Sequence, residues 1–120
     1  MTLAEIVVVV AHNSPIKQLS DHEIADVFLG KLARLPGGIT AVPLDLLEGS
    51  PARAEFYLQF TGKSPAQMRA FWSKVIFTGR GRPPRTPAND AEVIRALRET
   101  PGAIGYVSRS SLTAGARILR

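Results

Sequence analysis

The chain has 120 residues, of which 45% are hydrophobic and 21% are charged, so its composition is that of one folded domain rather than a disordered segment. It contains no cysteine, which excludes disulfide scaffolds, thiolate metal sites, iron–sulfur clusters and thiol nucleophiles. With 15 Lys and Arg against 10 Asp and Glu, the formal net charge is +5, and a basic chain favours anionic partners.

The first third of the chain predicts a strand, a helix and a second strand. The apolar, mostly β-branched run Ile6–Ala11 does not alternate, which is typical of a strand covered on both faces, as in a parallel sheet. The run is too short for a membrane span and short for a secretory leader. Ser20 and Glu23 form a capping box, which predicts a helix over residues 21 to about 32. A short strand is expected at 39–44.

Two later helices should begin at polar caps. Ser50 suits the N-cap, and Pro51 suits the first position, of a helix that ends at 61–62. A second helix should start at Asn89 and close at the Pro-Gly pair 101–102.

The most regular helical pattern lies between those two helices. A second capping box, Ser64 with Gln67, precedes apolar residues at i, i+3, i+4, i+7 and i+8. This spacing predicts a buried stripe, and we expect Phe77 to pack with it. The stripe consists of Met68, Phe71, Trp72, Val75 and Ile76. Residues 78–87 are rich in Gly, Pro and Arg and are expected to form a loop.

Strands expected at 103–107 and 116–119 complete the order of elements. Strands that are separated by helices favour an α/β fold. The expected architecture is one domain over residues 1–120, with a mixed or mainly parallel sheet flanked by about four helices.

The turn that opens the helix after Ser50 is the first candidate site. It follows a predicted strand, so unpaired backbone N–H groups and the positive end of the helix dipole would favour an anion there. Gly49 belongs to the turn, the Ser50 hydroxyl could donate to the anion, and Arg53 could bind two of its oxygens. In the simpler alternative, Ser50 only caps the helix and Arg53 is solvated.

The charge of the chain is uneven. Between Glu55 and Asp90 there is no acid, whereas six basic residues occur there: Lys63, Arg69, Lys74, Arg80, Arg82 and Arg85. The loop at 79–85 could contact phosphate, RNA or an acidic protein, or it could simply be solvated. Nucleic acid is not expected, because the nearby aromatic residues are needed for packing. Thr78 and Asn89 lie beside helix ends in this region and are weaker candidates to line an anion site.

No catalytic or metal-binding motif is found. The two histidines, His12 and His22, are ten positions apart, with no second ligand at the spacing of a metal site. His12, Ser14 and Asp21 supply the residue types of a catalytic triad, but closeness in the chain is no evidence of the required geometry. A nucleophile elbow, a His-Glu-x-x-His helix and a P-loop are all missing. We therefore expect no enzyme activity, no cofactor and no metal.

Three segments together resemble one protein family. They are residues 19–31, which end in Phe-Leu-Gly-Lys; Glu48-Gly49-Ser50 before a helix rich in Phe and Tyr; and Pro-Gly-Ala-Ile-Gly-Tyr-Val at 101–107, which is the most specific. In this order they resemble the phosphate-type substrate-binding proteins of bacterial ABC transporters, which have the type II periplasmic-binding-protein fold. The resemblance covers residues 6–108.

This resemblance implies a minimal relative with a single lobe, because the family closes two lobes on an oxyanion and this chain has room for one. It also implies a non-enzymatic protein, periplasmic or secreted once a signal peptide is removed. The ligand would be phosphate or sulfate, held weakly at a helix N-terminus. The partner would be a transporter, a sensor or a second copy of the chain.

The match at the phosphate turn is incomplete. The family reads Arg-x-Asp-Gly-Ser-Gly-Thr, whereas residues 46–52 read Leu-Leu-Glu-Gly-Ser-Pro-Ala. Gly49 and Ser50 are kept, the Arg is Leu46, and Pro51 removes one N–H donor. These departures leave an alternative, a protein–protein interaction or regulatory module with a degenerate ligand site and its contact surface at 80–85.

Overall fold

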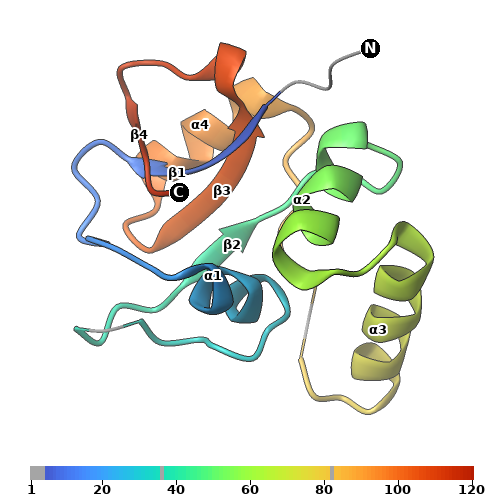
Figure 1. Cartoon of the computed structure of the whole chain (residues 1–120). Helices are drawn as coiled ribbons and strands as arrows, with labels where there is room; N and C mark the ends of the chain where they lie inside the picture. Colours follow the sequence, from blue (N-terminus) through green and yellow to red (C-terminus); the bar gives the residue numbers. More distant parts are fainter. Residues whose placement is uncertain (1–4, 36, 82) are drawn as a thin grey trace.

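A computed structural model of the chain describes residues 5–35, 37–81 and 83–120. The sheet within these ranges has the strand order β2-β3-β1-β4 (Figure 1). In chain order the elements are β1 (Ile6–Ala11), α1 (Asp21–Phe28), β2 (Val42–Leu44), α2 (Pro51–Thr61), α3 (Pro65–Phe77), α4 (Asp90–Glu99), β3 (Ala103–Ser108), a 3-10 turn (Arg109–Ser111) and β4 (Ala116–Ile118).

The sheet is mixed, as predicted. β2 pairs in parallel with β3, whereas β1 is antiparallel to both of its neighbours, β3 and β4. The parallel neighbours suggested by the apolar run of β1 are therefore wrong. Every residue of β1 is buried, because helices cover both faces of the sheet. This burial produces the continuous apolar run whatever the direction of the neighbouring strands.

β3 shows how the two faces are covered. Neighbouring residues of a strand point to opposite faces, and a Cβ on Gly105 would lie 2.7 Å from Val93 of α4. The next residue, Tyr106, instead packs against Phe28 of α1 and stacks on Phe56 of α2 at 4.0 Å between ring centroids. α4 therefore covers one face, behind the sheet in Figure 1, and α1 and α2 cover the other.

Gly102 lies where the chain enters β3. It is buried, its carbonyl accepts a 2.9 Å hydrogen bond from Val42 N, and its Cα faces the backbone of Thr40. A Cβ at this position would overlap the Thr40 carbonyl oxygen. The glycine therefore permits the close approach of two backbones at the start of the parallel pair.

α1 starts as predicted but ends earlier. Both hydrogen bonds of its capping box are present, 2.8 Å from Ser20 N to Glu23 and 3.1 Å from Glu23 N to Ser20. The helix stops at Phe28 rather than near residue 32. Gly30, with φ of +76°, turns the chain away, and a Cβ there would contact the Trp72 ring at 3.4 Å.

α3 has the predicted bounds and capping box, but only the first part of its stripe is buried. Met68 and Trp72 are in the core, whereas Ile76 is 55% exposed and Phe77 is 91% exposed. The prediction that these two residues pack in the core is wrong. α3 packs mainly on α2 and projects from the rest of the molecule in Figure 1, which leaves Ile76 and Phe77 exposed at its C-terminal end.

The two edge strands are shorter than expected. The segment predicted at 39–44 is a strand only over Val42–Leu44, and its Pro43 is tolerated because β2 lies at the edge of the sheet. None of the described helices is long and apolar enough to cross a bilayer.

Candidate functional site

The corner between β2 and α2 is built as the sequence predicts. Gly49 has φ of +96°, and Ser50 has the extended backbone of an N-cap. The Ser50 hydroxyl accepts a 3.4 Å hydrogen bond from Arg53 N, and Pro51 occupies the first turn of the helix. The N-terminus of α2 therefore faces outward at the end of β2, where sheets of this kind place their ligands.

The Arg53 side chain is turned inward. Its Nε lies 3.4 Å from Asp45 Oδ2, its guanidinium lies 5.1 Å from the Tyr57 ring centroid, and only 13% of the side chain is exposed. An Arg that already faces a carboxylate offers less charge to a second anion. Its predicted role as an anion ligand is untested, and Asp45 would compete for it.

Asp45 is the centre of a buried polar cluster. It is 1% exposed and accepts hydrogen bonds from Tyr57 Oη at 2.5 Å, from Tyr106 Oη and from Leu46 N at 2.7 Å. Together with Arg53, these groups satisfy both carboxylate oxygens and connect β2, α2 and β3. We call Asp45, Arg53, Tyr57 and Tyr106 the Asp45 cluster. No local motif marks this cluster in the sequence, and its one signal is Asp45, the only acid within the apolar segment 42–47.

The two tyrosines of the cluster are held in their neutral form. Burial, and then the Asp45 carboxylate, raise the pKa of Tyr57 and Tyr106 well above the usual tyrosine value of about 10. The folded state therefore keeps two protons that the unfolded state loses above that pH. The contribution to stability is complete below about pH 10 and is lost as the pH rises beyond it.

An alkaline titration tests this cluster, because the chain has only two tyrosines and both belong to it. We expect no tyrosinate absorbance near pH 10. The signal should appear only with unfolding, while the free energy of unfolding falls by up to about 2.7 kcal/mol per pH unit. Tyr57→Phe should halve the tyrosinate signal. It should also halve the decrease in the free energy of unfolding per pH unit. A tyrosinate midpoint near pH 10 with native circular dichroism would contradict the buried arrangement.

Two helix N-termini open onto one surface hollow. The hollow has a volume of about 520 Å³, and its lining includes Ser50 and Ala52 of α2 and Asn89 of α4. Asn89 caps α4 by accepting a 3.0 Å hydrogen bond from Glu92 N, as predicted for a helix start. Two predicted site residues from different parts of the chain, Ser50 and Asn89, are thus brought together here.

A second hollow lies on the other side of the same corner. It has a volume of about 240 Å³ and is lined by Gly49, Ser50 and Arg53, together with Glu48 and Arg69. Glu48 pairs with Arg69 of α3 at 3.2 Å, and both side chains are about half exposed. Gly49, Ser50 and Arg53 therefore share one concave surface, which carries a negative group beside its positive ones.

Thr78 does not join either hollow. It follows the last residue of α3, and its hydroxyl donates to the carbonyl oxygens of Lys74 and Val75 at 3.0 and 3.1 Å. The structure therefore gives Thr78 a role in ending the helix and places it apart from Ser50 and Asn89.

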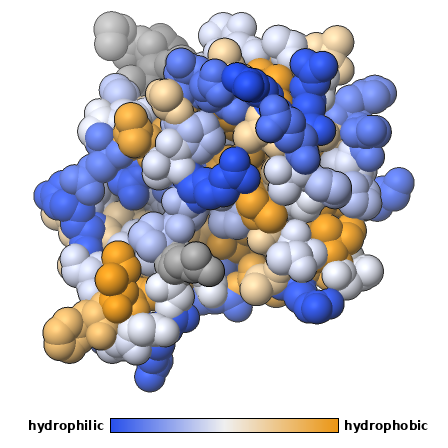
Figure 2. Space-filling view, turned by 180° about the vertical axis from the view of Figure 1, so that it is seen from behind, coloured by the Kyte–Doolittle hydropathy of each residue, from blue (hydrophilic) through white to orange (hydrophobic). Residues whose placement is uncertain are grey.

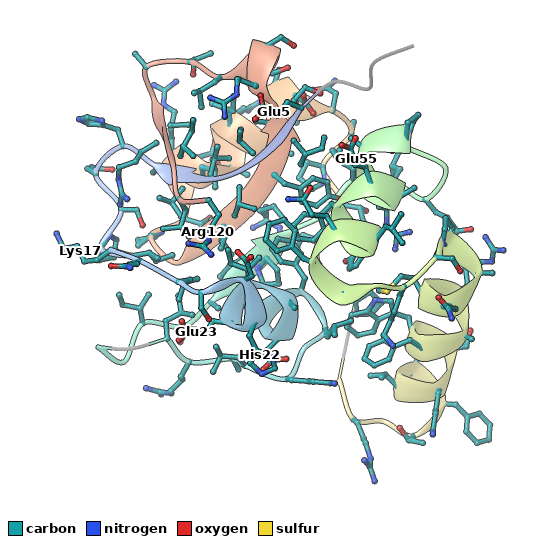
Figure 3. The ribbon with its side chains drawn as sticks, viewed as in Figure 1. Glu5, Lys17, His22, Glu23, Glu55 and Arg120 are labelled. Atoms are coloured by element: carbon teal, nitrogen blue, oxygen red, sulfur yellow. The ribbon has the colours of Figure 1, made fainter. Side chains whose placement is uncertain are left out.

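Two residues of the conceivable triad, Ser14 and Asp21, have other partners. Ser14 is buried and accepts a hydrogen bond from Ile16 N, and Asp21 pairs with Arg120 at 2.7 Å. His22, at the solvent side of α1 in Figure 3, pairs with Asp26 at 3.2 Å. Among residues 5–35, 37–81 and 83–120, no group of three His, Asp or Glu side chains could hold a metal ion.

Comparisons with solved structures show what this architecture resembles. A phosphate ABC transporter substrate-binding protein from Clostridium perfringens, solved with bound phosphate, matches 98% of the chain with a TM-score of 0.76 at 17% identity. PstS from Borrelia burgdorferi matches 97% with a TM-score of 0.70 at 16% identity. An ABC-type phosphate transport receptor from Vibrio cholerae matches 98% with a TM-score of 0.63 at 10% identity.

The chain shares its fold with about half of each of these substrate-binding proteins. This confirms the resemblance drawn from the three sequence segments. The chain spans only 44–46% of the length of these structures, in keeping with the single lobe that the sequence predicts. No protein-family model and no curated protein sequence matches the chain.

Proposed function

We propose that the chain is a non-enzymatic, substrate-binding-protein-like lobe that binds a small oxyanion, phosphate or sulfate, at the N-terminus of α2. The observation that carries this proposal is the hollow of about 520 Å³ onto which the first turns of α2 and α4 both open. Helix N-termini favour anions through unpaired N–H groups and the helix dipole. The fold supports the proposal, since one solved structure of similar architecture holds phosphate.

The first turn of α2 supplies few amide donors. Arg53 N donates to the Ser50 hydroxyl and Ala54 N to the Ser50 carbonyl, while Pro51 has no N–H. In the described part of the chain the Ala52 amide has no hydrogen-bond acceptor, so it is the donor that remains for a ligand. The Ser50 hydroxyl, which uses a lone pair for its cap, can still donate its own proton.

The surrounding charges predict a low affinity. The Arg53 charge is opposed by Asp45, and Glu48 lies beside Gly49. Asp90 lines the hollow as well, although its carboxylate accepts a 3.1 Å hydrogen bond from Ser108 N. Because the hollow is open to solvent, water and salt also weaken the attraction between the anion and the groups that line it. We therefore expect binding in the millimolar range, where RT ln Kd is about −4 kcal/mol.

Titration calorimetry with sodium phosphate and sodium sulfate tests the proposal. We expect saturable binding of phosphate at low ionic strength, and at least about a tenfold loss of affinity in Ser50→Ala, because a hydrogen bond to a charged group is worth about 1.5–3 kcal/mol. Ser64→Ala is the matched control. Ser64 also precedes a Pro and caps α3 by accepting a hydrogen bond from the amide three residues later, and it lines neither hollow at the α2 corner.

Both serine variants should lose about 1 kcal/mol of stability from the lost cap. Only Ser50→Ala should change the binding of phosphate. Equal affinities in the two variants, or no heat change with either anion, would remove the binding site while leaving the fold unaffected.

The same fold supports our proposals on location and partners. We propose that the protein acts in the periplasm or outside the cell, with a transporter, a sensor or a second copy of the chain as its partner. Fractionation of cells that express the native gene is the direct test of the location.

A further inference from the structure

The C-terminal end of α3 exposes two large apolar side chains next to each other. Phe77 is 91% exposed and Ile76 is 55% exposed. In Figure 2, which views the molecule from behind, an orange group projects at the lower left, where α3 ends. A single exposed apolar residue is ordinary on a protein surface, but an adjacent pair that projects beside a hollow calls for an explanation.

The hollow beside this pair has a mixed lining, in which four apolar residues lie together with Glu48, Arg53, Arg69 and Ser73. It has a volume of about 340 Å³, and its lining includes Met68, Trp72, Ile76 and Pro83. Ile76 belongs both to the hollow and to the exposed pair, so the two form one continuous surface. A projecting side chain beside a concave site suits a polypeptide partner, which has side chains to fill the hollow. A flat bilayer would cover Phe77 and leave the hollow empty.

The charge around this surface is mainly positive, since the one acid that lines the hollow, Glu48, pairs with Arg69 at 3.2 Å. Lys74 lies one turn before Phe77 on α3, and Arg80 follows three residues after it. The sequence from residue 56 to residue 89 contains no acid. A second copy of the chain would bring the same positive region against this one, which like-charge repulsion disfavours. An acidic partner would gain from the same charge.

We propose that Lys74, Ile76, Phe77 and Arg80, which we call the α3 tip, dock an acidic segment of another protein. One large apolar side chain of that segment packs into the hollow beside Ile76, and its carboxylates face Lys74 and Arg80. Aromatic anchors surrounded by complementary charge are typical of the residues that dominate binding energy. None of the four α3-tip residues lines either hollow at the α2 corner, although the hollow beside Ile76 shares Glu48, Arg53 and Arg69 with the smaller of the two. The test is therefore made at Phe77, whose replacement leaves the α2 corner unchanged.

A peptide library displayed on phage and selected on the immobilised full chain tests the proposal. We expect the recovered peptides to be rich in Asp and Glu and to share a Leu or Phe. Synthetic copies should change the fluorescence of Trp72, the only tryptophan of the chain, which lines the hollow. Their affinity should fall with added salt and drop at least about tenfold in Phe77→Ala.

Leu58→Ala is the matched control, because Leu58 is 62% exposed on α2 and is also a large apolar residue. Neither variant removes a core side chain, so both should fold. Recovery of no acidic peptide, or equal peptide affinity in Phe77→Ala and Leu58→Ala, overturns the proposal. So does Phe77-dependent binding to phosphatidylglycerol vesicles, or Phe77-dependent dimerisation in sedimentation, in the absence of peptide binding.

Discussion

Replacing Asp45 by alanine is expected to lower the free energy of unfolding by about 4 kcal/mol. The substitution leaves the Tyr57 and Tyr106 hydroxyls and the Arg53 guanidinium without the acceptor that they share, while the Leu46 amide keeps only Tyr106 Oη, at 3.2 Å. An unpartnered buried polar group keeps its full desolvation cost, and this substitution creates several at once. Denaturant unfolding at neutral pH measures the loss, which should also lower the Tm by about 15 °C.

Glu48→Ala is the matched control for this prediction. Glu48 belongs to the same corner and also pairs with an arginine, but its carboxylate and Arg69 are both about half exposed. An exposed pair contributes about 0.2–1 kcal/mol, so this variant should remain close to the unmodified chain. A loss in Asp45→Ala of the same size as in Glu48→Ala would mean that the Asp45 cluster does not hold β2, α2 and β3 together.

Local signals in the sequence predicted most of the elements. The capping box Ser20–Glu23 and the Ser50-Pro51 pair fixed the starts of α1 and α2, because a cap is decided by a few neighbouring residues. The strand directions were harder to predict. The run Ile6–Ala11 reports burial on both faces, and burial does not depend on whether the neighbours are parallel.

The candidate site was predicted only in part. Gly49 and Ser50 were found because a strand followed by a capped helix is a local pattern. The Asp45 cluster was missed because its members lie up to 61 positions apart, and only the folded chain shows that they meet. The inward orientation of Arg53 follows from the same contact, so its reduced charge toward a ligand could not be read from its position beside Ser50.

The buried stripe of α3 was overestimated for a related reason. Periodicity shows which side chains share a helix face, but it does not show how far the neighbouring element extends along that face. Met68 and Trp72 are buried, with the Trp72 ring facing Gly30, whereas Ile76 and Phe77 are exposed. Ile76 and Phe77 follow the same apolar pattern as the buried residues of α3 but lie outside the core. This mismatch between pattern and burial is the signal that identifies the α3 tip.

The second large effect is expected from Gly102→Ala, which should destabilise the chain by about 3 kcal/mol or more. The new Cβ would overlap the Thr40 carbonyl oxygen, which belongs to the backbone and cannot rotate away as a side chain can. The chain would have to separate at the start of the β2–β3 pair, where Val42 N donates to the Gly102 carbonyl. Denaturant unfolding measures the loss.

Two other glycines turn this prediction into a graded series. A Cβ on Gly105 would lie 2.7 Å from Cγ1 of Val93, a side-chain atom that can move in part, so this variant should lose about 1–3 kcal/mol. A Cβ on Gly81 would lie at an ordinary 3.6 Å from Val75, so Gly81→Ala should change stability by less than about 0.5 kcal/mol. If Gly105→Ala costs more than Gly102→Ala, side-chain packing against α4 rather than backbone approach explains the Pro-Gly-Ala-Ile-Gly-Tyr-Val segment.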